Sequence, residues 1–277
     1  MLDPLETTRR IDNAFLGYLR SSFGPRRPEL RDAYHRALIE GGDLSRGPFV
    51  QATAPFKPGR SVDELIQAGV LSAGMRDLAE SFPLDRPLHG HQEAAILKSV
   101  EHERNLVVST GTGSGKTEAF LFPIIEHLLG EREAGTLGKP GVRALLLYPM
   151  NALANDQVKR LRGLLAPLPE ITFGRYTGET EETQLRAESD FQQRYPGATL
   201  HPNELISRQV MKERPPHLLL TNYAMLEYLL LRPDDTPFFD GEHAKSWKFL
   251  VLDEAHVYNG AQGTEVAYLL RRLKDRV

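Results

Sequence analysis

A turn rich in glycine and hydroxyl residues, with one lysine, has the residue types that bind phosphate. The sequence NLVVSTGTGSGKTEAFLFPIIEHLL predicts an apolar strand, a glycine-rich turn and an amphipathic helix. Glycines let a backbone fold around an anion with its amides pointing inward, and the start of the next helix carries partial positive charge. The turn comprises Thr110, Gly111, Thr112, Gly113, Ser114, Gly115, Lys116 and Thr117. We therefore expect it to bind the phosphates of a nucleotide.

Lys116 and Thr117 have separate expected tasks at this turn. The lysine reaches the β and γ phosphates, and the threonine hydroxyl is a ligand for Mg²⁺, which bridges those phosphates. The first position of the strict G-x-x-x-x-G-K-[ST] pattern is Thr110 and not glycine. A glycine-rich loop without a nucleotide is the alternative interpretation, and the predicted strand and helix on either side disfavour it.

A second chemical group follows an apolar strand near the end of the chain. In KFLVLDEAHVY, the strand delivers Asp253 and Glu254 at its carboxyl end. Asp253 can hold Mg²⁺, usually through water, and Glu254 is the candidate to orient and deprotonate an attacking water. Alone, these acids could belong to an exposed turn. Their place on a separate predicted strand, 137 residues after Lys116, favours a joint site.

The elements that must position these residues alternate between short apolar runs and amphipathic helices. That alternation predicts an α/β fold with a parallel sheet covered by helices on both faces. Ligand sites of such sheets lie at the carboxyl ends of the strands. The strand candidates are residues 105–109, 144–148, 171–176, 217–221 and 248–252. Residues 179–215 are polar and lack apolar periodicity, so we expect an irregular insertion or two surface helices there.

The first 84 residues form a predicted, mostly helical N-terminal module, and residues 85–277 form the nucleotide-binding domain. Helical spacing of apolar residues covers residues 1–38 and is interrupted at Gly24, Pro25 and Pro28. Residues 41–59 are rich in glycine and proline and predict an extended segment or linker. Ser61 is placed to cap one short helix, and Ser72 precedes another.

Composition excludes several classes of protein. The 277 residues contain no cysteine, which rules out a disulfide framework, cysteine-ligated zinc and a cysteine nucleophile. The net charge of -3 argues against a polycation that coats nucleic acid. No apolar run approaches the roughly 20 residues of a membrane-spanning helix, so we expect a cytoplasmic protein without membrane contact. His89 and His91 lack a third ligand, and we assign them to helix packing or the surface.

Together these motifs resemble superfamily 2 helicases of the DEAD/DEAH type. The resemblance implies the N-terminal RecA-like lobe of a P-loop NTPase, with ATP and Mg²⁺ as cofactors. PLHGHQEAAI resembles the adenine-reading segment of that family, in which Gln92 would hydrogen-bond the base. A plain glutamine on a helix surface is the alternative. The resemblance also assigns His256 to coupling between hydrolysis and movement.

Three further segments match the family in the expected order and imply contact with nucleic acid. They are YPMNALANDQVKRL, GRYTGET and LLLTNYAMLEYLL. Hydroxyl, amide and backbone donors at helix starts suit phosphate contacts without base recognition. The matching residues are Pro149, Asn151, Ala152, Gln157, Thr177, Gly178, Thr221 and Asn222. For the first segment, an amphipathic helix that binds no nucleic acid is the alternative.

DEAHVYNGAQGTEVAYLLRRL narrows the resemblance to large bacterial helicases related to the mitomycin-repair helicase and the Hrq-type RecQ-like enzymes. It implies the ATP-binding half of an ATP-dependent DNA helicase or translocase, in DNA repair or phage defence. No second RecA-like lobe is recognisable in the 277 residues, so we expect the rest of a longer protein or a separate subunit to supply it. The alternative is a scaffold or regulatory subunit that binds nucleotide or nucleic acid without being a motor. Intact Lys116 and Glu254 favour the motor.

Overall fold

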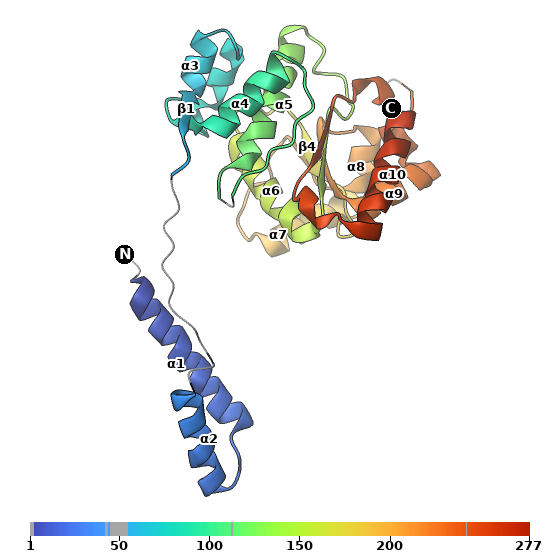
Figure 1. Ribbon diagram of the computed structural model, residues 1–277. Helices are drawn as coiled ribbons and strands as arrows, with labels where there is room; N and C mark the ends of the chain where they lie inside the picture. The colour runs from blue at the N-terminus through green and yellow to red at the C-terminus, as the bar shows by residue number, and fades with distance from the viewer. Residues whose placement is uncertain (1–2, 42–43, 45–54, 112, 242) are drawn as a thin grey trace. The chain divides into compact units, whose positions relative to one another are not determined.

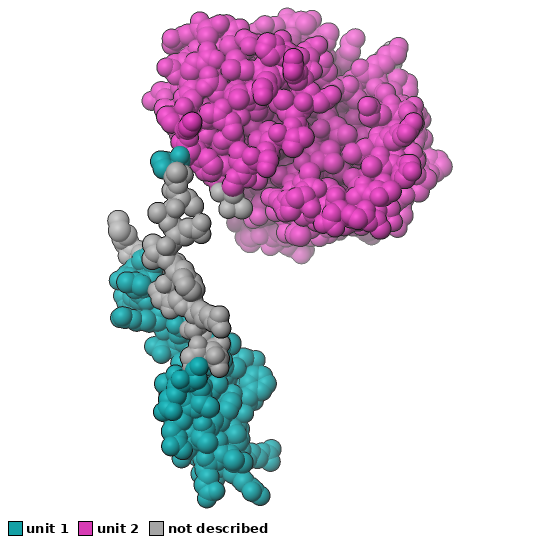
Figure 2. All heavy atoms as spheres, in the orientation of Figure 1, with its two compact units in different colours: residues 1–55 teal, residues 56–277 magenta. Residues whose placement is uncertain are grey.

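The computed structural model describes residues 3–41, 44, 55–111, 113–241 and 243–277. Two compact units comprise Met1–Pro55 and Phe56–Val277, which Figure 2 distinguishes by colour. The glycine- and proline-rich segment expected at residues 41–59 lies mostly outside the described residues.

The first unit contains two helices, as the apolar spacing predicts. Helix α1 spans Pro4–Phe23 and α2 spans Pro28–Glu40. The Asp3 carboxylate caps α1 by accepting a hydrogen bond from the Leu5 amide at 2.9 Å. Neither helix has a buried residue.

The first elements of the second unit belong to the same compact body as the sheet. Strand β1 (Pro58–Ser61) pairs antiparallel with β2 (Pro87–His89). Helix α3 (Val62–Gln67) begins at a capping box formed by Ser61 and Glu64, which confirms the predicted cap. The short 3₁₀ helix η1 (Ala73–Glu80) follows Ser72. Their apolar side chains join the main core, so the structure divides the chain near residue 55 and not at the predicted residue 84.

The predicted α/β fold is confirmed by a five-stranded parallel sheet of order β5-β4-β6-β3-β7 (Figure 1). Helices on one face pack against Ala144, Leu146 and Tyr148, and those on the other against Leu145 and Leu147. The strands are β3 (Ala144–Tyr148), β4 (Phe173–Arg175), β5 (Glu204–Leu205), β6 (Leu218–Asn222) and β7 (Phe249–Leu252). The first face carries α4 (Gly90–Val100), α5 (Lys116–Glu133) and α6 (Asn151–Leu164), and the second carries α9 (Tyr223–Leu231) and α10 (Gly260–Arg276).

The remaining elements connect these layers. The insertion forms the two predicted helices, α7 (Gln184–Arg194) and α8 (Arg208–Glu213), and also contributes the short β5. Three 3₁₀ helices complete the unit, η2 (Pro233–Phe238), η3 (His243–Ser246) and η4 (Ala255–Val257). No helix of the described residues is long and apolar enough to cross a membrane.

The strand predicted at residues 105–109 is wrong, because these residues form no strand in the structure. Val107 is 97% exposed, and the sheet ends at β7 with nothing paired to its outer edge among the described residues. An apolar run becomes a strand only where a neighbouring strand accepts its backbone hydrogen bonds, and the run itself does not specify that neighbour.

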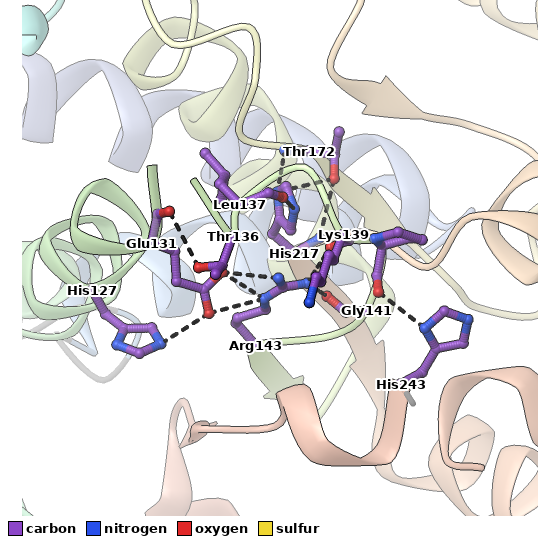
Figure 3. Close-up of polar contacts among 11 residues, drawn as sticks. His127, Glu131, Thr136, Leu137, Lys139, Gly141, Arg143, Thr172, His217 and His243 are labelled. Carbon is purple, nitrogen blue, oxygen red and sulfur yellow. Dashed lines mark hydrogen bonds and ion pairs between the residues drawn. The ribbon is translucent and has the colours of Figure 1, made fainter. Parts of the chain in front are cut away.

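A buried polar network holds the amino ends of β3 and β6 to the end of α5 (Figure 3). The Arg143 guanidinium, 3% exposed, donates to Glu131 at 2.9 Å and to the carbonyls of Lys139 and Gly141, both at 2.7 Å. Nδ1 of His217 accepts from the Thr172 amide at 3.0 Å, and Nε2 lies 2.9 Å from the Leu137 carbonyl. These contacts require a neutral imidazole with its proton on Nε2.

Burial, reinforced by the positive charge of Arg143, lowers the pKa of His217 to about 4. In the unfolded chain its pKa is near 6.5, so the unfolded state binds the proton first as the pH falls. The neutral His217 side chain therefore contributes its full share of folding stability above pH 6.5. That contribution is lost as the pH falls from about 6.5 to 4.

We predict that His217 makes folding sensitive to mild acid. Between pH 7 and 4.5 the wild type should lose about 2 kcal/mol of unfolding free energy that a His217→Gln variant does not lose, measured by urea denaturation. The exposed His102 serves for a control, since His102→Gln should keep the wild-type pH dependence. Equal acid sensitivity of wild type and His217→Gln would contradict this assignment.

Candidate nucleotide and nucleic-acid site

The glycine-rich turn requires glycine at two positions because of its backbone conformation. Gly113 has φ of 73° and Gly115 has φ of 69°, in the left-handed region that side chains disfavour. Gly115 is the residue before α5, and Lys116 and Thr117 form the first turn of that helix. Thr112 lies outside the described residues. The phosphate-binding geometry predicted for the turn therefore rests on backbone angles that substitution at Gly115 would disturb.

Side chains inside the turn bind one another. The hydroxyls of Thr110 and Ser114 lie 2.6 Å apart, and the Lys116 ammonium donates to the Thr110 carbonyl at 3.1 Å. Thr110, which departs from the strict pattern, therefore supplies both a hydroxyl and a carbonyl to the turn. A bound phosphate group would compete with the Thr110 carbonyl for the Lys116 ammonium.

Gln92 is buried, with 3% exposure, and its amide contacts the turn. Its Oε1 accepts from the His89 amide at 2.6 Å. Its Nε2 donates to the Gly115 carbonyl at 2.7 Å and lies 3.3 Å from a carboxylate oxygen of Glu118. Both ends of the amide that was predicted to recognise adenine are thus engaged within the protein. Because Gln92 is buried, the alternative of a plain surface glutamine does not hold, and its recognition of adenine stays a prediction.

The two histidines beside Gln92 pack against an aromatic ring. The Phe56 ring centroid lies 5.1 Å from that of His89 and 5.6 Å from that of His91. No group of three or more histidine, cysteine or acidic residues able to hold a metal occurs in the described part of the chain. The histidine rings therefore lie where the packing interpretation placed them.

Strand β7 delivers the two acids at the carboxyl edge of the sheet. The Asp253 amide donates to the Leu147 carbonyl at 3.0 Å, which continues the pairing of β7 with β3. One Asp253 oxygen accepts from the Glu254 amide at 2.9 Å. Glu254 has φ of 49°, an uncommon conformation for a residue other than glycine, and its carboxylate lies 3.3 Å from Nδ1 of the exposed His256. Such strained residues cluster at functional sites.

Tyr148 is the cross-strand neighbour of Asp253 and was not anticipated as a site residue. It is 1% exposed, and its hydroxyl has no hydrogen-bond partner among the described residues. Burial and the nearby Asp253 charge raise the pKa of Tyr148, and burial with Tyr223 and Asp253 raises the pKa of Tyr258 to about 12. Both hydroxyls thus keep their protons at neutral pH and can donate hydrogen bonds.

The glycine-rich turn and the two acids come from separate elements, the start of α5 and the end of β7. No hydrogen bond or ion pair in the described residues joins Lys116 or Thr117 to Asp253 or Glu254. Helix α5 packs on the sheet face that carries Tyr148. Among the described residues, the second carboxylate oxygen of Asp253 has no hydrogen-bond partner, and neither does the Tyr148 hydroxyl.

Asparagine side chains connect the segments predicted to contact nucleic acid. The Asn222 amide donates to the Asn151 side-chain oxygen at 2.8 Å, and the Asn151 amide donates to Glu179 at 2.9 Å. Asn222 also caps α9 by accepting from the Met225 amide at 2.7 Å. Gly178 is exposed beside Glu179. The structure therefore brings three separate predicted segments together at one edge.

The other predicted contact residues differ in exposure. Ala152 is exposed and Pro149 is half-buried. Thr177 and Thr221 have no exposed surface, and the Thr221 hydroxyl donates to the Tyr176 carbonyl at 2.6 Å. Gln157 is also buried, at 7% exposure. These three side chains are buried and do not face solvent.

Two charged residues next to the predicted motifs were missed. Glu118, directly after Thr117, is 8% exposed and forms an ion pair with Arg160 of α6. Arg160 follows Gln157 by three residues and lies near it on the helix surface. An acid in the first turn of the helix that follows a phosphate loop is the signal that could have identified Glu118.

Comparison with known proteins decides the family. The model for the DEAD/DEAH box helicase family matches residues 90–277, which contain the glycine-rich turn, the two acids and the edge segments. The chain belongs to the DEAD/DEAH box helicase family. The resemblance seen in the motifs is thereby confirmed.

Relatives place this helicase chain in the expected group. The chain is 32% identical to Druantia protein DruE of Escherichia coli over 88% of its own length, and spans 18% of that protein. It is 30% identical to ATP-dependent helicase hrq1 of Schizosaccharomyces pombe over 61% of its length, and spans 13% of that protein. The chain thus spans about a fifth or less of these two relatives.

Solved structures agree with the fold. The DUF1998 helicase MrfA bound to DNA and AMPPNP superposes with a TM-score of 0.56 at 24% identity, over 80% of this chain and 26% of MrfA. The Mycobacterium smegmatis helicase Lhr bound to ssDNA and AMP-PNP gives 0.53 at 25% identity, over 75% of this chain and 23% of Lhr. The helicase chain therefore has a RecA-like fold.

We predict that Gly115→Ala weakens nucleotide binding by the helicase chain while leaving it folded. A methyl group there would lie 2.5 Å from Nε2 of Gln92 and 2.9 Å from a Glu118 oxygen, and φ of 69° adds strain. Fluorescence titration with a labelled ADP and Mg²⁺ should show at least a tenfold weaker Kd. Gly130→Ala is the matched control, because Gly130 lies inside α5 with open space around its α-carbon. Equal Kd values for both variants would contradict the role of Gly115.

Proposed function

We propose that this chain is the ATP-binding lobe of an ATP-dependent DNA helicase or translocase. The observation that carries the proposal is that a member of the DEAD/DEAH box family has both a turn with left-handed glycines before α5 and the Asp253-Glu254 pair after β7. The amides of the turn, Lys116 and the start of α5 bind the phosphates. Helicases of this family are named ATP-dependent, so ATP is the nucleotide.

Mg²⁺ fits the donors that this edge offers. Hard cations take oxygen ligands and usually keep several waters. The Thr117 hydroxyl is one ligand and Asp253 binds through water, while the unpartnered Tyr148 hydroxyl can donate to such a water. Glu254 orients and deprotonates the water that attacks the γ phosphate. The exposed His256 lies 3.3 Å from Glu254 and couples that step to movement of a facing domain.

Nucleic acid binds along the edge formed by the asparagine network. The donors there suit the sugar-phosphate backbone and carry no base recognition, which allows movement along any sequence. Pro149, Asn151, Ala152, Gly178 and Asn222 form the contact surface, and the buried Gln157, Thr177 and Thr221 hold it in shape. MrfA and Lhr were solved bound to DNA, which supports DNA as the substrate here.

Turnover requires a second RecA-like lobe from the remainder of a longer protein or from a separate subunit. The small share of the relatives that this chain spans supports this part of the proposal. A second lobe commonly supplies an arginine that stabilises charge on the γ phosphate and accelerates transfer by about 10³ to 10⁵. DNA repair or phage defence is the biological setting that the resemblance to these helicases supports. The scaffold alternative is not favoured, since both Lys116 and Glu254 are present.

We predict that the purified chain binds ATP without appreciable turnover and that Lys116→Ala weakens binding by about tenfold to hundredfold, the loss expected for one charge-assisted contact. Binding is measured with labelled nucleotide and Mg²⁺, and turnover by phosphate release with and without single-stranded DNA. Lys245→Ala is the control, because this exposed lysine lies in η3 away from the turn.

Turnover stimulated by nucleic acid would show that the chain completes its own catalytic site, against the requirement for a second lobe. Absence of nucleotide binding by the wild type would contradict the ATP-binding function and favour the scaffold.

A further inference from the structure

Glu118 is a buried acid whose contacts are with neighbouring helices and not with the phosphate-binding turn's lysine. It lies in the first turn of α5, and its side chain contacts α4 and α6. One carboxylate oxygen pairs with Arg160, and the other lies 3.3 Å from Nε2 of Gln92. Arg86 is a more distant cation at 4.0 Å.

These contacts continue to the backbone of the phosphate-binding turn. The Gln92 amide that meets Glu118 also donates to the Gly115 carbonyl at 2.7 Å. Gly115 is the last residue before Lys116 and has a left-handed backbone conformation. A shift of the Gln92 amide therefore acts on the peptide that orients the first turn of α5.

At its other end, the chain of contacts reaches the proposed nucleic-acid edge. Arg160 lies on α6, which begins at Asn151. A helix transmits displacement along its axis, and nine residues correspond to roughly 13 Å of helix. Asn151 is bonded to both Asn222 and Glu179, so a ligand at that edge contacts the same rigid element that holds Arg160.

Packing alone would not require this arrangement. Replacing a buried ion pair by apolar residues of similar volume is often neutral or stabilising. Apolar side chains could therefore pack α5 against α6 without the desolvation penalty of a buried carboxylate. Arg160 also has space to move: its side chain is 41% exposed and borders a cavity of about 350 Å³ that Arg86 and Lys159 also line. The ion pair can therefore form and break without disrupting the core.

We propose that Gln92, Glu118 and Arg160 form a relay that couples nucleic-acid binding at α6 to nucleotide binding at the Gly115 turn. The inference rests on the proposed function and deepens it by naming the residues that connect its two sites. Glu118 and Arg160 are positioning residues that touch neither ligand, and Gln92 joins them to the turn. Coupling of this kind is reciprocal, because each ligand changes the affinity for the other by the same factor.

The relay gives Gln92 a role in addition to the expected recognition of the base. Its amide bonds to His89, Gly115 and Glu118 hold the shape of the turn. A Gln92→Ala variant should therefore lose affinity for labelled GDP as well as for labelled ADP. Unchanged affinity for labelled GDP would overturn this role.

The test compares the Kd of labelled ADP with Mg²⁺ in the absence and presence of a saturating single-stranded DNA oligonucleotide. The chain is used whole, as wild type, Glu118→Gln, Arg160→Gln and the double variant. The ratio of the two Kd values should be about fivefold or more in the wild type, within the usual range for coupled sites. It should fall toward one in each single variant, and the double variant should lose no more than either single one.

Arg162→Gln is the matched control on the same helix. Arg162 pairs with the buried Glu204 at 2.6 Å, so the variant breaks an equivalent ion pair on α6 without touching the relay. Its coupling ratio should remain that of the wild type. Arg160 is partly exposed, so Arg160→Gln keeps the test valid even if Glu118→Gln does not fold.

The outcomes separate the relay from the proposed function. Wild-type coupling in Arg160→Gln would overturn the relay, as would independent binding of ADP and DNA by the wild type, while the proposed function would stand. A wild type that binds neither ligand would overturn the proposed function itself, together with the relay that rests on it.

Discussion

Parallel pairing of β3 with β6 on one side and β7 on the other is the constraint on which the rest of the structure depends. Leu145 of β3 lies opposite Leu219 of β6 and Leu250 of β7. Since the three strands run in the same direction, their carboxyl ends meet at one edge, where the backbone turns outward and can meet a ligand. Asn151, Asn222 and Asp253 reach that edge from three parts of the chain because the apolar strands are in register.

Buried polar groups near the turn and the acids differ in how their hydrogen bonds are satisfied. Gln92 and Glu118 use their polar atoms inside the protein, whereas the Tyr148 hydroxyl has no partner in the described residues. An unsatisfied buried hydroxyl is costly, and such groups in native proteins call for an explanation. The proposed function would provide one, because a water of a cation held near Asp253 would accept a hydrogen bond from the Tyr148 hydroxyl.

Sequence patterns correctly predicted a strand in which every side chain is buried. Residues 144–148 were placed correctly because every side chain of β3 is buried and the run is continuously apolar. The run at residues 105–109 has the same character yet forms no strand, because strand formation depends on a partner that local sequence does not name. Ser61 was recognised as a cap because its partner, Glu64, lies three residues away.

Side-chain direction was the part that sequence could not supply. The contact of Gln92 with Gly115 was not anticipated, because these residues are 23 positions apart and are brought together only by packing of α4 on α5. Thr177 and Thr221 match family motifs, yet the register of β4 and β6 buries them. Glu118 was overlooked because its significance depends on Arg160, which belongs to another helix.

Hydrogen–deuterium exchange of the whole chain tests most directly whether one sheet edge holds both ligands. A non-hydrolysable ATP analogue with Mg²⁺ should protect residues 110–118 and 253–256, and single-stranded DNA should protect residues 149–153, 177–179 and 222–225. The opposite edge around Arg143 and His217 should exchange at its ligand-free rate. Protection confined to that opposite edge, or none at the carboxyl ends of β3, β6 and β7, would contradict the account.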